Sequence, residues 1–112
     1  MLYTNLKHIE NDVDFEKAID THFDVVVCCG DMGYRSINVY KNIEKLVPKM
    51  KHVSFYDMEF GNPILENIRA KLNCDDQTEL PFILHFRNAK LNKRLSVGLN
   101  EKLPDLKKEL TL

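Results

Sequence analysis

The segment at residues 23–29, Phe-Asp-Val-Val-Val-Cys-Cys, constrains the fold of this chain more than any other part of the sequence. Its β-branched and apolar residues fall on both faces of an extended strand. A strand that is apolar on both faces is typical of a central parallel strand with helices on either side. The sequence then continues through Gly30-Asp31-Met32-Gly33 into a helical pattern, which predicts a strand, a glycine-punctuated turn and a helix.

The other elements of the first half alternate in the same way. Residues 1–8 form a weak first strand, and Asn11 is placed to cap a helix. The second helix, which follows the turn, is expected to end or kink at Pro48, and residues 52–57 form a third strand. The apolar positions are Phe15, Ala18 and Ile19 in the first helix, and Val39, Ile43, Leu46, Val47 and Met50 in the second.

The second half begins with a helix and continues with a hairpin. Asn62-Pro63 is a helix start signal, and a polar loop covers residues 73–78. Two strands, residues 81–87 and 91–97, flank a turn at residues 88–90 and predict a β-hairpin. Pro104 opens a short last helix. The positions predicted to pack inward are Ile64, Leu65, Ile68 and Leu72 in the third helix, and Leu106 and Leu110 in the last.

The predicted order of elements is therefore β-α-β-α-β-α-β-β-α. Strands that alternate with helices predict right-handed crossovers and a parallel arrangement, and the hairpin adds antiparallel strands at the end. The fold class is α/β, with a central mixed sheet and helices on both faces. A chain of 112 residues with 44% hydrophobic residues buries one core, so residues 1–112 are expected to be a single domain.

The composition excludes several classes of partner. Sixteen basic and 17 acidic residues give a formal net charge of −1, so there is no positive field to attract nucleic acid. The longest apolar run, residues 25–29, is far too short to span a bilayer. No signal peptide is apparent at residues 1–10, and three cysteines do not make a disulfide framework. We therefore expect a reduced, cytoplasmic protein without cofactor or bound metal.

The turn and a second apolar strand together resemble the thioredoxin superfamily. About fifty residues after the turn comes Leu80-Pro81-Phe82, at the head of that strand. In the superfamily a strand feeds an active-site turn, and a proline in cis that leads another strand faces it. The resemblance covers the whole chain without an insertion, and it implies a thioredoxin-like fold with a cis bond between Leu80 and Pro81.

The same resemblance shows that the redox residues of the family are missing. The two cysteine positions of the C-x-x-C motif fall on Gly33 and Ser36. The buried aspartate of the family falls on Val27, and the proline inside the second helix falls on Lys41. Glycine has no side chain, and an unassisted serine hydroxyl is too weak a nucleophile for disulfide exchange. Ser36 is instead expected to cap the second helix.

The resemblance also places a binding cleft between the turn and the proline loop. Methionine and aromatic side chains at the rim of such a cleft favour peptide binding, although they could equally fill the space of the missing cysteine and tryptophan. The residues expected to form the cleft are Met32, Gly33, Tyr34, Arg35, Ser36, Leu80, Pro81 and Phe82.

The three cysteines allow two interpretations. Cys28 and Cys29 are adjacent on one strand and therefore point to opposite faces. In the first interpretation Cys28 is a small core residue, Cys29 is a partly shielded thiol and Cys74 has no special role. In the second, Cys29 lines the cleft as a nucleophile, and Cys74 or an external thiol resolves the product.

Three functions follow from these alternatives. The first is a redox-inactive, thioredoxin-like module that holds an extended segment of a partner protein in the cleft. The second is an atypical thiol-disulfide oxidoreductase that uses Cys29. The third is a structural subunit whose cleft has no role. The first two differ in whether Cys29 is accessible and reactive.

Overall fold

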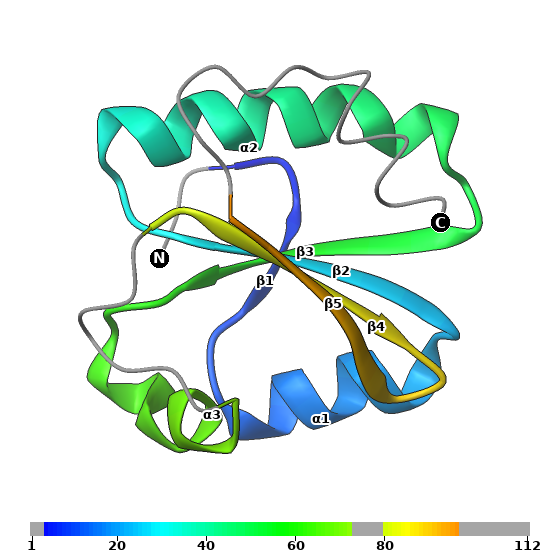
Figure 1. The fold of residues 1–112 in the computed structure, drawn as a ribbon, viewed down its shortest axis with the longest axis vertical. Helices are drawn as coiled ribbons and strands as arrows, with labels where there is room; N and C mark the ends of the chain where they lie inside the picture. Colours follow the sequence, from blue (N-terminus) through cyan, green and yellow to red (C-terminus); the bar gives the residue numbers. More distant parts are fainter. Residues whose placement is uncertain (1–3, 73–79, 97–112) are drawn as a thin grey trace.

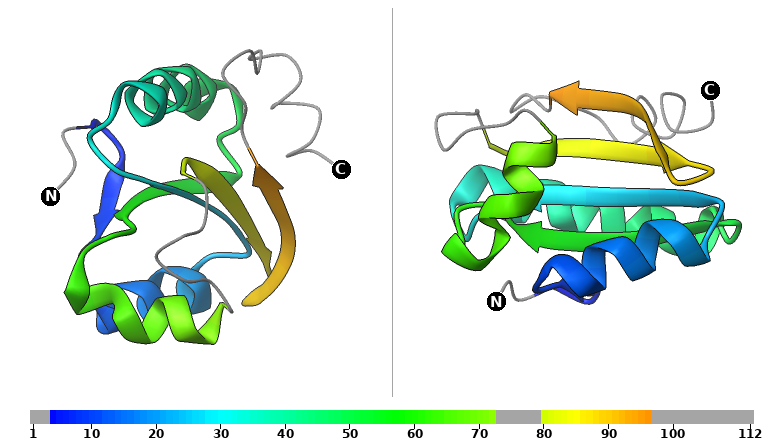
Figure 2. Two further views of the ribbon diagram at one scale, coloured as in Figure 1. Left: turned by 60° about the vertical axis from the view of Figure 1, so that its left-hand side comes forward. Right: turned by 90° about the horizontal axis from the view of Figure 1, so that it is seen from below.

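The computed structural model of the protein describes residues 4–72 and 80–96, which form one mixed sheet between two layers of helix (Figure 1). Helix α2 covers one face of the sheet, and helices α1 and α3 cover the other (Figures 1 and 2). None of the described helices is both long enough and apolar enough to span a membrane. The elements are β1 (Lys7–Ile9), α1 (Asp12–Thr21), β2 (Asp24–Gly30), α2 (Tyr34–Leu46), the 3₁₀ turn η1 (Val47–Lys49), β3 (Val53–Glu59), the 3₁₀ turn η2 (Pro63–Leu65), α3 (Glu66–Lys71), β4 (Phe82–Arg87) and β5 (Lys90–Ser96).

The sheet has the strand order β1-β3-β2-β4-β5. Strands β1, β3 and β2 are parallel, and β4 pairs antiparallel with both β2 and β5. The predicted α/β class and the parallel arrangement of the first three strands are confirmed. The predicted loop at residues 73–78 and the predicted last helix from Pro104, with Leu106 and Leu110, lie outside the described residues.

The two faces of β2 divide the core as the alternation of its side chains predicted. Val26 and Cys28 pack on the α2 side, in one apolar cluster with Ile43 of that helix. Val25 and Val27 pack on the opposite side, among residues of α1 and α3. Every residue of β2 is buried. Full burial on both faces explains why the sequence of this strand is almost entirely apolar.

The ends of two helices differ from the prediction. Val47 was expected on the buried side of the second helix, but it is 38% exposed. The α-helix ends at Leu46, and Val47 begins a 3₁₀ turn that contains Pro48. A 3₁₀ turn has a larger rotation per residue than an α-helix, so Val47 does not continue the buried face of α2. Ile64 is 64% exposed for the same reason, because it lies in the 3₁₀ turn η2 and not on the helical face of Leu65.

The hairpin between β4 and β5 has a two-residue loop. Asn88 and Ala89 both have left-handed backbone conformations, with φ of 54° and 64°. Two consecutive left-handed residues are typical of the tight loop whose twist matches that of paired strands. The backbone N–H of Asn88 donates to the carbonyl oxygen of Phe23 at 2.9 Å, which ties the loop to the start of β2. The loop was predicted one residue longer, at residues 88–90.

The helix caps follow the sequence signals. The side chain of Asn11 accepts a hydrogen bond from the backbone N–H of Asp14 at 2.8 Å, at the start of α1. Asn62 caps η2 in the same way, because its Oδ1 accepts from the N–H of Ile64 at 3.1 Å. Both N-terminal caps were predicted, and both are confirmed.

A buried polar network lies at the end of the sheet where β2 begins. The Oδ1 atom of Asp24 accepts hydrogen bonds from Arg87 Nε at 2.9 Å and from His85 Nε2 at 3.1 Å. Because the Nε2 atom of His85 carries the hydrogen that bonds Asp24, its Nδ1 atom is free of hydrogen. This Nδ1 accepts a hydrogen bond from Asn92 Nδ2 at 3.3 Å. Burial acts to raise the pKa of Asp24, but the hydrogen bonds and charges of Arg87 and His85 outweigh it, and the pKa is held below 3.8.

This network predicts a pH-dependent effect of the change Asp24→Asn. At neutral pH the variant should lose about 2 kcal/mol in the free energy of unfolding, because two hydrogen bonds to a charged acceptor are weakened. A carboxyl with a lowered folded pKa stabilises the protein above its unfolded pKa and loses that contribution as the pH falls below it. The difference between variant and wild type should therefore shrink below pH 3.8, the ordinary value for Asp24. Urea unfolding across pH measures it.

The control for this experiment is Asp20→Asn, on the exposed side of α1. It should change the free energy of unfolding by less than about 0.5 kcal/mol. A difference for Asp24→Asn that stayed constant down to the acid transition would contradict the assignment to its ionised carboxylate.

Candidate functional site

The candidate site lies at the end of the sheet formed by the C-terminal ends of the parallel strands β1, β3 and β2. β2 ends at Gly30, and β4 begins beside it, because Cys29 pairs with Phe82 in the antiparallel register. The N–H of Phe60, just after β3, donates to the carbonyl oxygen of Gly30 at 2.9 Å. The turn at residues 31–33, the start of α2, Pro81 and the ends of β1 and β3 are therefore close together. In open α/β sheets, ligands bind at the C-terminal ends of the strands.

The turn is held by the side chain of Asp31. Its Oδ1 accepts hydrogen bonds from the backbone N–H of Gly33 at 2.8 Å and from the hydroxyl of Ser36 at 2.9 Å. The Ser36 Oγ in turn accepts from the backbone N–H of Asp31 at 3.2 Å. A carboxylate thus lies at the N-terminus of α2, where the helix dipole favours negative charge.

Ser36 does not cap α2, although the sequence predicted that it would. Gly33 is the N-cap residue of α2, and no side-chain hydrogen bond caps the helix from that position. Ser36 lies two residues inside the helix, is buried, and bonds back to Asp31. It therefore fixes the turn and does not line an open surface.

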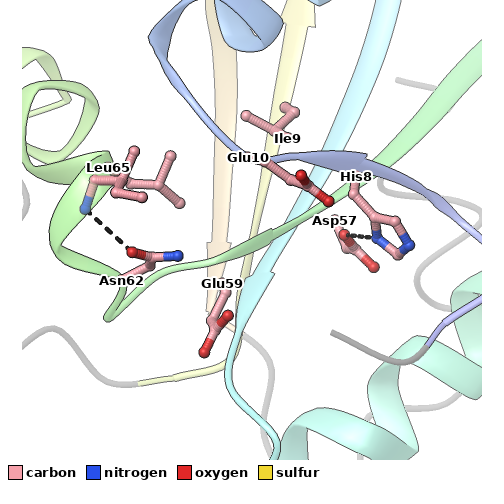
Figure 3. Close-up of a pocket in the computed structure, with 8 residues that line it drawn as sticks. His8, Ile9, Glu10, Asp57, Glu59, Asn62 and Leu65 are labelled. Atoms are coloured by element: carbon pink, nitrogen blue, oxygen red, sulfur yellow. Dashed lines mark hydrogen bonds and ion pairs between the residues drawn. The ribbon is translucent and has the colours of Figure 1, made fainter. Parts of the chain in front are cut away.

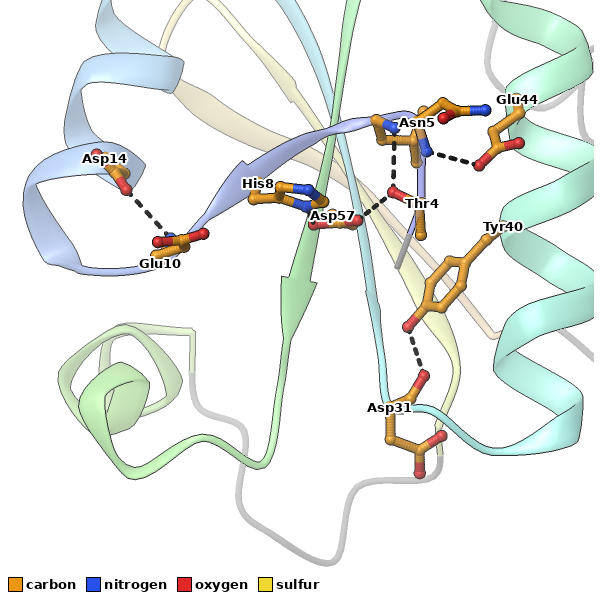
Figure 4. A network of polar contacts seen from close by, with 10 residues as sticks. Thr4, Asn5, His8, Glu10, Asp14, Asp31, Tyr40, Glu44 and Asp57 are labelled. Carbon is orange, nitrogen blue, oxygen red and sulfur yellow. Dashed lines mark hydrogen bonds and ion pairs between the residues drawn. The ribbon is translucent and has the colours of Figure 1, made fainter. Parts of the chain in front are cut away.

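The end of β2 needs a glycine at residue 30. A Cβ atom placed there would lie 2.3 Å from the hydroxyl oxygen of Tyr40 and 2.9 Å from Ser36 Oγ. The Tyr40 hydroxyl donates to the carbonyl oxygen of Asp31 at 3.0 Å, so it cannot move away without loss of that bond (Figure 4). Tyr40 and Ser36 thus pack directly against the backbone of the turn.

The structure places the other predicted cleft residues in different environments. Met32 is 42% exposed on the turn, and the side chains of Tyr34 and Arg35 lie outside the described part of the structure. Leu80 is partly exposed, and the bond between Leu80 and Pro81 is cis, the isomer that the resemblance implied.

Phe82 does not line the surface as expected, because its side chain is only 1% exposed. Its ring contacts that of Phe60 edge to face, with 4.9 Å between the ring centroids. The guanidinium carbon of Arg94 lies 4.7 Å from the same ring centroid. The residue after Pro81 is therefore an anchor of the core.

Cys29 is more deeply buried than was expected from the sequence. Cys29 was interpreted either as a partly shielded thiol or as a nucleophile that lines the cleft, but it is 0% exposed. Cys28 is also 0% exposed, as expected of a core residue. The Sγ of Cys29 lies 3.9 Å from the carbonyl oxygen of Val27. Burial, reinforced by the nearby charge of Asp57, raises the pKa of the Cys28 thiol. Neither residue forms a disulfide bond, and Cys74 lies outside the described residues.

A polar cluster that the sequence did not predict holds β1 to β3. Asp57 on β3 is buried, and its Oδ1 contacts His8 Nδ1 at 2.6 Å (Figure 4). Its other oxygen accepts from the hydroxyl of Thr4, which also accepts from the N–H of Leu6. Burial raises the pKa of Asp57, although its bonds to Thr4 and His8 act in the opposite direction. Asp57, a charged residue in the predicted strand at residues 52–57, was a signal for a polar contact there, but it did not identify His8 or Thr4 as partners.

A cavity of about 160 Å³ opens beside this cluster, at the ends of β1 and β3 (Figure 3). No three His, Cys, Asp or Glu side chains within residues 4–72 and 80–96 converge as ligands for a metal ion. The cavity is lined by His8, Ile9, Glu10, Asp57, Glu59, Asn62, Ile64 and Leu65.

Comparisons with solved structures identify the fold. Thioredoxin from Fasciola hepatica is 21% identical, covers 95% of this chain and 97% of its own, and has a TM-score of 0.77. Oxidised thioredoxin from Plasmodium falciparum is 16% identical over 96% of each chain, with a TM-score of 0.78. Mitochondrial thioredoxin 3 from Saccharomyces cerevisiae is 15% identical over 95% of this chain and 93% of its own, with a TM-score of 0.77.

Sequence comparison adds no closer assignment, since no protein-family model and no curated protein matches the chain. The structural similarity extends over nearly the whole length of both chains, and the strand order includes the antiparallel hairpin. The protein therefore has the thioredoxin fold.

Proposed function

We propose that this chain is a redox-inactive thioredoxin-fold module that binds an extended segment of a partner protein. The binding surface would lie between the turn at residues 31–33 with the start of α2 and Pro81. One observation carries the proposal: Gly33 and Ser36 stand at the start of α2, where thioredoxins have their dithiol, while Cys28 and Cys29 are fully buried in β2. Because neither described cysteine offers an accessible thiolate, what the C-terminal end of these strands can offer is a binding surface.

The described geometry supports binding by a preformed surface. The backbone of the turn is fixed by Asp31, Ser36 and Tyr40, so little conformational freedom remains to be lost. Met32 projects from this fixed turn with 42% of its side chain exposed. An exposed methionine is adaptable and favoured at protein interfaces. It is the best candidate for the apolar contact with a partner.

The alternative, an oxidoreductase that uses Cys29, requires that residue to meet a substrate. Attack on a disulfide needs a thiolate within bonding distance of the sulfur, and a side chain with 0% exposure cannot reach it. No described contact favours this alternative. Its discriminating measurement, the reactivity of the thiols, is among the predictions below.

The binding proposal predicts a large effect of the change Met32→Asp. Peptides selected on the wild-type protein from a random displayed library should bind the variant at least about tenfold more weakly, because the change removes an apolar contact and places a charge beside Asp31. Isothermal titration calorimetry with the selected peptides measures the change in Kd.

Leu91→Asp is the matched control, since Leu91 is 45% exposed, much like Met32, but follows the hairpin loop at the other end of the sheet. It should leave the Kd within about twofold of wild type. Selection that enriches no peptide, or peptides that both variants bind as the wild type does, would contradict the proposal.

A further inference from the structure

The cavity at the ends of β1 and β3 combines apolar walls with an acidic rim (Figure 3). Ile9 and Leu65 are buried in its wall, and Ile64 borders it with 64% of its side chain exposed. Glu10 and Glu59 supply carboxylates at the strand ends. The lining holds one basic residue, His8, whose Nδ1 is already bound to Asp57.

This combination fits a long cationic side chain better than a small ion. The acidic residues do not converge as metal ligands within the described part of the chain. A lysine or arginine side chain has an apolar stem and a charged head, so the stem can contact isoleucine and leucine while the head stays near carboxylates. A cavity of about 160 Å³ has room for one such side chain.

The cavity adjoins the proposed binding surface. Glu59 pairs with Gly30 in the parallel register, and the N–H of Phe60 bonds the carbonyl oxygen of Gly30. Neighbouring strands are about 4.8 Å apart, and an extended chain advances about 3.3 Å per residue. Because β2 lies between β4 and β3, a segment that crosses the turn from Pro81 would reach Glu59, at the near side of the cavity, within about three residues.

The wall of the cavity is fixed in advance. The backbone N–H of Asn62 donates to the carbonyl oxygen of Glu59 at 3.1 Å, and its Oδ1 accepts from the N–H of Ile64 at 3.1 Å. Arg69 Nη1 also donates hydrogen bonds to the carbonyl oxygens of Phe60 at 2.6 Å and Asn62 at 2.9 Å. Because these contacts already order the wall, little conformational entropy is lost when a ligand binds against it.

We propose that this cavity receives a lysine or arginine side chain of the bound segment, so that the preferred partner carries a basic residue next to the part held by the turn. The inference rests on the proposed function for the segment itself. The cavity, however, can be tested without any peptide.

The test uses two small probes that differ in one group, N-acetyl-lysine methylamide and N-acetyl-norleucine methylamide. In NMR titrations at neutral pH, the lysine probe should shift the signals of Glu10, Asn62 and Ile64 with a Kd of about 1–10 mM, and the norleucine probe should bind at least about fivefold more weakly. Glu10→Gln should weaken the lysine probe about threefold or more. Asp20→Asn, on the exposed side of α1 near its C-terminal end, is the control and should change nothing.

Three results would overturn the inference. They are equal binding of both probes, an unchanged Kd in Glu10→Gln, and stoichiometric displacement of the lysine probe by Ca²⁺ or Zn²⁺, which would assign the cavity to a metal. If the lysine probe binds but no peptide is selected on the wild type, the cavity stands and the proposed function fails. If the selected peptides lack lysine and arginine, and the lysine and norleucine probes bind with equal Kd, only the inference fails.

Discussion

Cys28 and Cys29 should both be alkylated at least about a thousandfold more slowly in the native protein than in urea. Both thiols are 0% exposed, on opposite faces of the central strand, so a reagent reaches them only when the strand opens. Opening of a central strand requires much of the global free energy of unfolding, which is several kcal/mol for a domain of this size. Mass spectrometry of the protein after timed exposure to iodoacetamide measures both rates.

The same experiment tests the oxidoreductase alternative. Rapid native labelling of Cys29 at pH 6 would show an accessible thiolate and would overturn the binding proposal in its present form. Reduction of insulin by the wild-type protein, lost in Cys29→Ser but kept in Cys28→Ser, would do the same. We expect no such turnover, since the start of α2 carries Gly33 and Ser36.

Replacement of Gly30 by alanine should lower the free energy of unfolding by about 3 kcal/mol. The new methyl group would lie 2.3 Å from the Tyr40 hydroxyl oxygen, so that side chain must move and give up its bond to the carbonyl oxygen of Asp31. Overpacking and the loss of a buried hydrogen bond each cost about 1–3 kcal/mol. Urea denaturation followed by circular dichroism measures the change.

Gly61→Ala is the matched control for this prediction. A Cβ at residue 61 meets nothing within 4 Å, and the residue does not have a positive φ. Its free energy of unfolding should stay constant or rise by up to about 1 kcal/mol, because alanine restricts the unfolded chain. Equal effects at the two glycines would mean that Tyr40 does not pack against Gly30 as described.

The fold was predictable because its signals are local. The two-faced apolar pattern of residues 23–29 placed β2 in the centre, and the cap at Asn11 marked the start of α1. The cap at Asn62 marked the start of η2, three residues before α3 begins. The errors at Val47 and Ile64 were also local. Both predictions extended an α-helical period through residues that a neighbouring proline holds in a 3₁₀ turn.

The site was less predictable because its contacts join distant parts of the chain. Asp57 meets His8 and Thr4, which precede it by 49 and 53 residues, and no local pattern announces such a pairing. Cys29 likewise belongs to a core cluster that includes Phe82 of β4 and Phe60 just after β3, which are far from it in the sequence. Alternation gave the face of Cys29 correctly but could not give its depth.

The carboxylate of Asp31 has a consequence for introducing a dithiol at the start of α2. A cysteine at residue 33 would place its Cβ 2.9 Å from Asp31 Oδ1, in the position where its thiolate ought to be stabilised. The negative charge that now satisfies the Gly33 N–H would repel the thiolate and keep its pKa high. Cysteines at residues 33 and 36 would therefore not be enough for a reactive pair, and Asp31 would have to be replaced as well. A dithiol at this turn would thus require at least three substitutions, and variants that keep Asp31 would gain no reactive thiolate.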